Sequence, residues 1–317
     1  MEVFQEVLKA EKRIRKYIHK TPLELSPYLS KLCNCNVFLK LESEQLTGSF
    51  KIRGAFNKLI SCKDQCKNGF ITASTGNHGR ATAYVAKMLN INGIVYVPEN
   101  VQVAKIEALQ FYDIGIKRYN GASGEVEMYA RKMAEEQGIP FISPYNDIDI
   151  IAGQGTIGYE IFQQLPKIDI VFVCIGGGGM ISGIAGYLKS MNKDVKIIGC
   201  EPKHSCAMSA SIKSGEIIEV EHKPTLSDGS AGGIEPGSIT FEFCKKYVDE
   251  YTQVTEDEIK NAMAYMIDKH HKIIEGAAAV PLASLIKSKD DFRNKNVVVV
   301  LSGSGVGINT IKKVICQ

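Results

Sequence analysis

The feature that most constrains the fold is an alternation of short β-branched runs with helix-like stretches. Six such runs lie at 36–42, 69–74, 93–98, 169–175, 195–201 and 296–302. Most are followed, after glycine or polar residues, by segments with helical spacing, such as 78–90 and 181–192. This alternation is typical of helices packed on mostly parallel sheets. The sequence therefore predicts an α/β protein, and it contains no low-complexity linker to mark a domain boundary.

Composition narrows the class of partner. The chain of 317 residues carries a formal net charge of +3, spread evenly, which argues against nucleic acid or a membrane surface and favours a small-molecule substrate. The N-terminal residues 1–20 alternate apolar and charged residues, unlike a secretory signal, and no apolar run approaches the ~18 residues of a spanning helix. We expect a cytoplasmic protein whose cysteines are reduced. Cys62 and Cys66 lack further ligands at zinc spacing.

Lys51 is the first residue whose setting suggests chemistry. In "LTGSFKIRGA", 46–55, it stands between Phe50 and Ile52, after a Gly-Ser pair that predicts a turn into a helix. A lysine can lie along an apolar face with its ammonium group in water. Alternatively, a partly desolvated amine loses its proton more readily, which suits an imine-forming nucleophile or a base. The local sequence leaves both interpretations open.

The stretch "ASTGNHG", 73–79, begins at the end of the run at 69–74 and leads into an alanine-rich helix. Its residues Ser74 to His78 form a polar turn at the start of that helix. Free N–H groups at a helix start, with hydroxyls beside them, can bind a carboxylate. Helix capping by Ser, Thr or Asn is the simpler alternative. Arg80 follows this turn and is either a surface cation or part of the same site.

Four consecutive glycines, Gly176 to Gly179, follow the hydrophobic run at 169–175 and precede a helix. Glycines cost chain entropy, and we expect no packing role that would offset this cost. Their N–H groups can surround an anion at the helix start, so we predict a phosphate site rather than a plain turn. No Lys-Ser or Lys-Thr ends the loop, so a nucleoside triphosphate is not indicated.

The glycines near the C-terminus, Gly303, Gly305 and Gly307, superficially match a dinucleotide fingerprint. Only ten residues follow Gly307, too few to supply the acidic ribose partner expected ~20 residues further on. We therefore expect a turn that brings Ser302 to the end of a central strand. The glycine-rich segment 227–238 predicts an irregular loop near the site.

Together these segments resemble the fold-type II pyridoxal-phosphate enzymes, and within them the threonine/serine dehydratase and serine racemase branch. The resemblance runs from about Thr21 to the C-terminus. Its motifs occur in the family's order: "SFKIRGA", "GNHG", the four glycines and "LSGSG". It implies two three-layer α/β/α domains with mostly parallel sheets, like tryptophan synthase β, and the cofactor in the cleft between them. A large domain is expected over 1–68 and 147–317, and a small inserted domain over 69–146.

The resemblance also implies the residues of the site. Lys51 would hold pyridoxal 5'-phosphate through an imine and, with Thr75, would take part in catalysis. The cofactor would be bound by Phe50, Lys51, Asn77, Gly176, Gly177, Gly178, Gly179, Met180 and Ser302. The substrate carboxylate would lie against Ser74, Thr75, Gly76, Asn77 and His78. A serine hydroxyl at the pyridine nitrogen makes the ring a weaker electron sink than an aspartate would, which favours prompt loss of a β-hydroxyl.

The implied activity is that of an ammonia-lyase (dehydratase) that converts L-threonine, L-serine or a related β-hydroxy amino acid to a 2-oxo acid and ammonia. Serine racemase is an alternative, since Thr75 keeps a hydroxyl where racemases have serine. A β-replacement enzyme is another, although Ile52 stands where such enzymes carry aspartate. A nucleotide-dependent dehydrogenase would leave Lys51 without a role, and a non-catalytic carrier of the cofactor would form no oxo acid.

Two further expectations concern partners. Some relatives bind a divalent cation with a Glu and an Asp in a Glu-Pro stretch; here Glu201 is present but Ala207 replaces the second carboxylate. We therefore assign no metal site, with Glu201 as the one candidate ligand. The substrate is an amino acid, and we expect a homodimer because family members usually form one.

Overall fold

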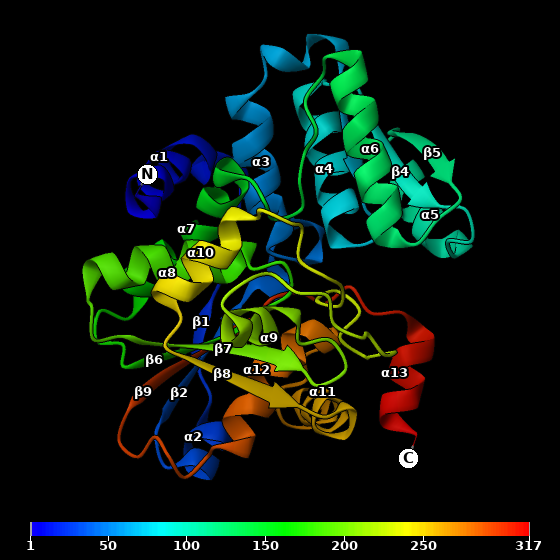
Figure 1. Cartoon of the computed structure of the whole chain (residues 1–317). Coiled ribbons are helices and arrows are strands. Elements are labelled where there is room, and N and C mark those ends of the chain that lie inside the picture. The colour runs from blue at the N-terminus through cyan, green and yellow to red at the C-terminus, as the bar shows by residue number, and fades with distance from the viewer. Residues whose placement is uncertain (1, 317) are drawn as a thin grey trace.

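The computed structural model describes residues 2–316 and contains two sheets (Figure 1). The larger sheet has the order β1 (Leu23–Leu25), β2 (Asn36–Leu41), β9 (Asn296–Leu301), β6 (Ile170–Cys174), β7 (Lys196–Pro202) and β8 (Glu250–Val254). Only β1 runs antiparallel to its neighbour. The smaller sheet is parallel, with the order β3 (Phe70–Ala73), β4 (Gly93–Pro98) and β5 (Gly115–Tyr119).

All six β-branched runs are strands, as predicted, and the sequence reading missed β1, β5 and β8. Strands β1 and β8 are the two edges of the large sheet, and β5 is one edge of the small sheet. The other edge of the small sheet is β3, which was predicted. Edge strands contact fewer neighbours, and β5 and β8 are mostly exposed or half-buried, whereas every residue of β3 and β6 is buried. Strands such as "GIKRY" therefore lack the continuous apolar run that identifies an interior strand.

Helices cover both faces of the small sheet. On one face lie α4 (Asn77–Leu89) and α5 (Val103–Gln110), and they share a hydrophobic cluster with α3 (Lys51–Ser61). On the other face α6 (Ser123–Gln137) packs Val126, Ala130 and Ala134 against Ile71 and Tyr96. The small unit is therefore a three-layer α/β/α structure.

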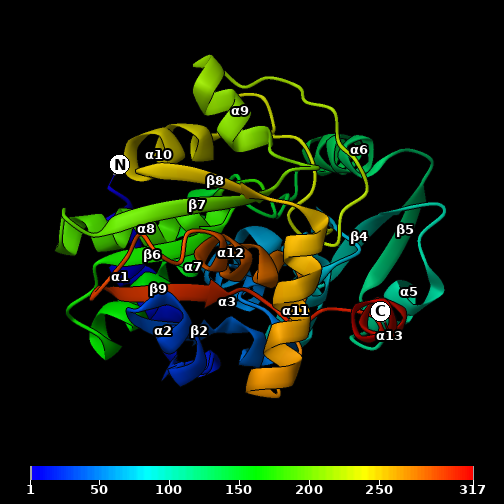
Figure 2. The same cartoon turned by 90° about the horizontal axis from the view of Figure 1, so that it is seen from below.

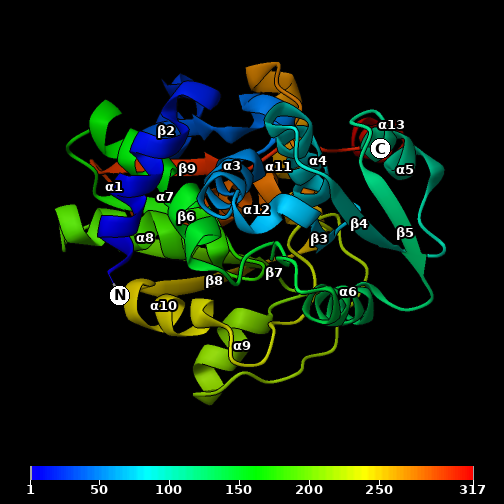
Figure 3. The ribbon, with the colours of Figure 1, turned by 90° about the horizontal axis from the view of Figure 1, so that it is seen from above.

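The large sheet is also covered on both faces (Figures 2 and 3). On one face α12 (Gly276–Lys287) packs across the central strands, beside α2 (Pro27–Cys33) and α11 (Glu256–His270). On the other face lie α8 (Gly179–Met191), α7 (Ile148–Gln164) and α1 (Val3–Ile14). The remaining helices are α9 (Ala207–Ser214), α10 (Ile239–Tyr247) and α13 (Ile308–Ile315), with short 3₁₀ turns η1 (Arg15–Tyr17), η2 (Glu42–Glu44), η3 (Leu46–Gly48) and η4 (Gln65–Asn68). The α/β fold class with mostly parallel sheets is confirmed.

The small sheet lies within 69–146, and the strands of the large sheet lie outside that range. Helix α3, expected in the large domain, contacts α7 on one side and α4 on the other. It thus joins the two units, and the division at 68/69 and 146/147 stays a prediction. Among residues 2–316, no helix combines the length and apolar character needed to cross a bilayer.

This topology determines where a site can form. Because β2, β9, β6 and β7 are parallel, their carboxyl ends meet at one edge of the large sheet. Ser302 and the four glycines follow two of these ends, and Ser74 follows the carboxyl end of β3 in the small sheet. Ligands of open α/β sheets bind at such edges. The motifs singled out in the sequence are thus collected between the two units.

Candidate active site

Lys51 begins α3, and the chain just before it is fixed to the carboxyl end of β9. Ser49 pairs with Gly303 in an isolated antiparallel bridge, and the Phe50 N–H donates to the Ser302 carbonyl oxygen at 3.1 Å. The first motif and the last are therefore joined by backbone contacts. This arrangement positions Lys51 rigidly beside Ser302.

The Lys51 side chain is half-buried rather than extended into water. Its Nζ donates to the Pro144 carbonyl oxygen at 2.9 Å and lies 5.2 Å from the centroid of the Phe50 ring. Burial lowers the pKa of the amine to about 8, although the carboxylates of Glu127 and Glu275 oppose this shift. Such an amine loses its proton close to neutral pH, as a nucleophile or base must.

Two buried hydroxyls beside Lys51 have no hydrogen-bond partner. Ser302 is 2% exposed and Ser49 is fully buried, and neither Oγ has a partner. Leaving such a group unsatisfied costs about 1–3 kcal/mol. A polar ligand atom that bonds Ser302 Oγ would remove this cost, and the pyridine nitrogen that the family resemblance assigns to Ser302 is such an atom.

The four glycines connect β6 to α8, and each lacks room for a side chain. A Cβ at Gly177 would lie 2.4 Å from the Tyr145 ring, and one at Gly179 would lie 3.0 Å from the Tyr145 backbone. Gly178 has φ +83°, and its Cβ would lie 2.9 Å from Met208 Cε. The expectation that these glycines have no packing role is therefore wrong. Their N–H groups at the start of α8 remain able to bind an anion.

The turn from Ser74 to His78 precedes α4 as predicted. The Gly76 N–H donates to Ser74 Oγ at 3.2 Å, and the first N–H groups of α4 have no acceptor within the helix. The His78 imidazole, 2% exposed, lies inside the small unit, with Nε2 3.0 Å from Thr72 Oγ1 and 3.1 Å from the Ile142 carbonyl oxygen. His78 can therefore offer a substrate carboxylate only its backbone N–H.

Asn77 is engaged by a partner that the sequence reading missed, Glu275. The Asn77 amide donates to both carboxylate oxygens of Glu275, at 2.9 and 2.8 Å, and its own oxygen accepts from Arg80 Nη2 at 2.7 Å. Glu275 also accepts from the Gly305 N–H at 2.9 Å. Burial raises the pKa of Glu275, and these hydrogen bonds oppose the shift. Arg80 is thus linked to Asn77 rather than being a free surface cation.

This network also explains the glycines near the C-terminus. A Cβ at Gly303 would lie 2.6 Å from Glu275 Oε1, and one at Gly305 would lie 2.5 Å from Asn77 Oδ1. The glycines make room for a buried carboxylate and do not form a dinucleotide loop. No local feature of the sequence pointed to Glu275 itself.

A second carboxyl group missed by the sequence reading is Glu127, on α6. Its Oε1 is buried without a hydrogen-bond partner, and the nearest cation on the same helix, Arg131 Nη2, is 3.9 Å away. Burial and the Glu235 carboxylate raise its pKa to about 7. Nothing in the periodicity of α6 distinguishes Glu127 from the other acidic residues of that helix.

Glu201 has a structural role in the described chain. It is 1% exposed and accepts from the N–H groups of Met208 and Ser209, at 3.0 and 3.1 Å, near the start of α9. Residues 2–316 contain no group of three His, Cys, Asp or Glu side chains arranged to hold a metal ion. Cys62 and Cys66 are buried with their sulfur atoms 3.5 Å apart.

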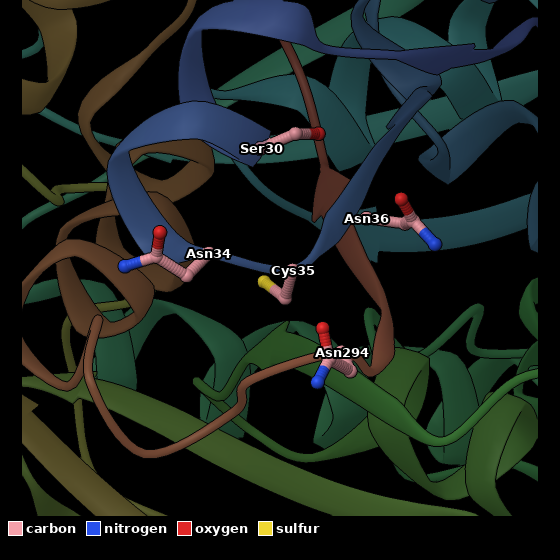
Figure 4. Close-up of a pocket in the computed structure, with 5 residues that line it drawn as sticks. All are labelled: Ser30, Asn34, Cys35, Asn36 and Asn294. Atoms are coloured by element: carbon pink, nitrogen blue, oxygen red, sulfur yellow. The ribbon is translucent and has the colours of Figure 1, made fainter.

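One surface pocket lies far from these residues (Figure 4). It is lined by Ser30, Asn34, Cys35, Asn36 and Asn294. Asn36 begins β2, and Asn294 precedes β9, so the pocket is at the amino ends of the parallel strands. That edge is opposite Ser302, and ligands of such sheets bind at the carboxyl ends. We assign the pocket no role.

Comparison with known proteins identifies the family. The family model for pyridoxal-phosphate dependent enzymes matches residues 14–303. The chain belongs to this family. Within it, the chain belongs to the fold-type II branch of threonine/serine dehydratases and serine racemases.

Three relatives illustrate this placement in the pyridoxal-phosphate family. The L-threonine ammonia-lyase of Thermotoga maritima is 37% identical over 316 residues, covering 99% of this chain and 78% of that protein. The processed form of threonine deaminase isoform 2 from Solanum lycopersicum superposes with a TM-score of 0.93 at 31% identity, covering 99% and 92%. Maize serine racemase superposes with a TM-score of 0.92 at 30% identity, covering 98% and 95%.

Proposed function

We propose that this protein is a pyridoxal-phosphate-dependent ammonia-lyase that removes the β-hydroxyl of L-threonine or L-serine and yields a 2-oxo acid and ammonia. The observation that carries the proposal is the Lys51 amine, whose pKa is lowered to about 8, beside the unpartnered Ser302 hydroxyl at the carboxyl edge of the sheet. The activities named for the Thermotoga and tomato relatives support it.

Residues of this chain fit the cofactor. Lys51 offers an amine for covalent attachment, with Phe50 beside it, and Ser302 offers a hydroxyl to the pyridine nitrogen. We assign the phosphate to the N–H groups of Gly176 to Gly179 and Met180 at the start of α8. We assign the Asn77 amide to the 3-oxygen of the cofactor ring. This contact requires Asn77 Nδ2 to share one N–H group between Glu275 and the cofactor, or to release it from Glu275. When bound, pyridoxal phosphate withdraws electrons from the α-carbon of the attached amino acid.

The protein's own groups then orient the substrate and move its protons. The turn from Ser74 to His78 holds the carboxylate with N–H groups and hydroxyls, which fixes the α-carbon. Lys51 Nζ would be the base that accepts the α-proton, because a pKa lowered to about 8 leaves part of the amine unprotonated near neutral pH. Thr75, half-buried in the same turn, is assigned beside the reacting carbon.

The decisive measurement is the visible spectrum of the protein loaded with pyridoxal phosphate, before and after adding L-threonine. We expect a yellow band from the Lys51-bound cofactor that changes on addition, with 2-oxobutanoate accumulating. The Lys51→Ala variant should lose both the band and the product. A protein that cannot take up the cofactor, or a variant that keeps turnover, would refute the proposal.

Serine racemase activity is the second candidate, favoured by the likeness to the maize enzyme and by the Thr75 hydroxyl. Racemization needs a second acid or base on the face of the substrate opposite Lys51. We expect it to be at most a side activity, because the Thr75 methyl group crowds this position. Chiral chromatography of an L-serine reaction tests this, and D-serine formed as fast as pyruvate would reverse the assignment.

We further propose that the protein is a cytoplasmic homodimer whose chain divides into a large domain, 1–68 and 147–317, and a small one, 69–146. The mild net charge supports the location. The strands of the small sheet all lie within 69–146 and those of the large sheet lie outside it, which supports the division, although one hydrophobic cluster joins α3 to α4 and α5 across the 68/69 boundary. Sedimentation equilibrium of the loaded protein would test the dimer, and a monomer at micromolar concentration would refute it.

A further inference from the structure

The segment between α9 and α10 crosses from the large unit toward the small one. It is irregular over 215–238, and Figures 2 and 3 show it extending to α6 and returning to α10. We call its residues 227–238 the strap. Both ends of the strap are fixed to the large unit: the Leu226 N–H just before it donates to Glu256 on α11 at 2.6 Å, and Ile239 just after it begins α10.

The strap borders the glycine loop that we assign to the cofactor phosphate. A Cβ at Gly176 would lie 3.0 Å from the backbone of Ser230, in the middle of the strap. Further along, the Glu235 N–H donates to the Tyr145 hydroxyl at 2.9 Å, and the Tyr145 ring in turn packs against Gly177. The strap is therefore in contact with the loop directly and through Tyr145.

Two ion pairs join the strap to helices of the small unit. Glu235 accepts from Arg131 on α6, with N–O distances of 2.9 and 3.0 Å to its two oxygens. The Arg131 guanidinium also stacks over the Phe141 ring at 4.4 Å, which restricts its movement. Near the start of the strap, Asp228 lies 3.6 Å from Lys105 on α5. The pair at Glu235 is shorter and less exposed, so it should contribute more to holding the strap.

Little apolar burial holds the strap in place. Ile234 is its one large apolar side chain, and most of its residues are exposed. Gly232 and Gly237 stand on either side of the stretch that carries Glu235, with φ of +133° and +72°, and in the described chain no atom lies within 4 Å of a Cβ at either. Apart from its ion pair, the Glu235 carboxylate accepts from Asn146 Nδ2 at 2.8 Å. Segments with so few apolar contacts open at a low cost in free energy.

We propose that the strap is a gate to the cleft between the two units, and that the Arg131–Glu235 ion pair is the clasp that keeps it closed. In the arrangement described here the gate is closed, because the strap connects the large unit to α6. When the clasp breaks, residues 232–237 turn about Gly232 and Gly237, and the glycine loop becomes accessible. The inference goes beyond the proposed reaction and rests on it only for the ligand, pyridoxal phosphate.

Hydrogen–deuterium exchange of the cofactor-free protein tests the clasp without ligand or turnover. Glu235→Gln and Arg131→Gln each remove one charge of the pair. In either variant the peptide that covers the strap should exchange at least about 3-fold faster than in wild-type protein, because the ion pair no longer opposes opening. The double variant should exchange no faster than the single ones, since they remove the same interaction. Unchanged exchange in both single variants, or additive effects in the double variant, would overturn the proposal.

Lys132→Gln is the matched control. Lys132 follows Arg131 on α6 and lies 3.7 Å from Glu136, in an exposed pair within the helix. The substitution removes a positive charge from the same helix, and exchange of the strap should stay at the wild-type rate. Peptides from β6 should exchange alike in every variant, which separates local opening of the strap from loss of the fold. The same acceleration in Lys132→Gln as in Arg131→Gln would also overturn the clasp.

The rate of cofactor uptake tests the gate itself. Cofactor-free protein is mixed with pyridoxal phosphate, and the yellow band is followed in time. If the strap must open first, Glu235→Gln and Arg131→Gln should both take up the cofactor about 3- to 10-fold faster than wild type and Lys132→Gln. The two substitutions change the local charge in opposite directions, so an electrostatic effect on the anionic cofactor would accelerate one and slow the other.

The outcomes of the two experiments are distinct. Uptake at the wild-type rate in both clasp variants, or opposite effects in the two, would overturn the gate. Wild-type protein that forms no yellow band would refute the proposed function instead. The exchange measurement requires no cofactor and therefore decides the clasp in either case.

Discussion

At the scale of single residues, the site is built from polar groups that the folded chain leaves unsatisfied. Ser302 Oγ and Ser49 Oγ are buried without partners, and burial of Lys51 lowers the pKa of its amine to about 8. Each of these features costs stability in the free protein. Such costs are typical of positions prepared for a ligand.

The Ser302→Ala variant tests this argument. Removing an unpartnered buried hydroxyl should leave the free energy of unfolding of the cofactor-free protein unchanged or raise it by up to about 1 kcal/mol, while the affinity for pyridoxal phosphate falls. Urea denaturation and cofactor titration measure the two effects. Ser143→Ala is the control, because Ser143 Oγ accepts from the N–H groups of Tyr145 and Asn146 and its loss should destabilise. A clear loss of stability in Ser302→Ala would contradict the argument.

At the scale of elements, the turn between β6 and α8 illustrates how packing and function can require the same residues. Gly177 and Gly179 make room for Tyr145, and the Gly177 carbonyl oxygen also accepts from Thr240 Oγ1 at 2.7 Å. Ligand binding alone does not explain why all four positions are glycine. Close contact with side chains and backbone of neighbouring elements is the second reason.

Gly178→Ala should therefore destabilise the protein even without cofactor. Its φ of +83° is strained for alanine, and the new Cβ would lie within 3.0 Å of Met208 Cε and Thr240 Cβ. We expect a loss of about 1–3 kcal/mol in the free energy of unfolding, measured by urea denaturation. Gly124→Ala in α6 is the control, because no atom lies within 4 Å of its Cβ, and it should be neutral or slightly stabilising. Equal effects of the two substitutions would refute this explanation.

At the scale of the whole molecule, buried charges connect the elements that carry Lys51. Arg53 on α3 donates to Glu42 and to Glu160 on α7, and Lys40 on β2 contacts Glu160 at 2.6 Å. Burial alone would raise the pKa of Glu160, but Arg53 and Lys40 outweigh it and lower the pKa to about 2. The network anchors the start of α3 between the large sheet and α7.

Two buried groups with lowered pKa values, His78 and Glu160, should make the protein less stable in acid. Burial, and then the charge of Lys51, lower the pKa of His78 from 6.5 to about 3, so the unfolded chain binds a proton that the folded chain excludes. The neutral imidazole makes its full contribution to the free energy of unfolding above pH 6.5, and this contribution is lost as the pH falls toward 3. The ionised Glu160 carboxylate likewise stabilises the folded protein above pH 4.5, and this stabilisation is lost as the pH falls toward about 2. Glu127, with a raised pKa, opposes them between pH 7 and 4.5.

The His78→Gln variant isolates the histidine. Glutamine can still donate to the Ile142 carbonyl oxygen but does not titrate. We expect the difference in unfolding free energy between wild type and variant to narrow as the pH falls from 7.5 to 4.5, and to stay constant above about 7, as measured by urea midpoints. A difference that is independent of pH would show that His78 is not excluded from protonation.

The sequence by itself determined the interior of this protein and the chemical character of its site. Buried strands need continuous apolar runs, so β2, β3, β4, β6, β7 and β9 were predictable, and the family motifs singled out Lys51 and Ser302 by type and order. Only the tertiary structure decided the edge strands β1, β5 and β8, the inward direction of the His78 imidazole, and the contacts of Glu275. Those features depend on contacts between residues far apart in the chain, such as Asn77 with Glu275, and a contact of that kind leaves no local periodicity in the sequence.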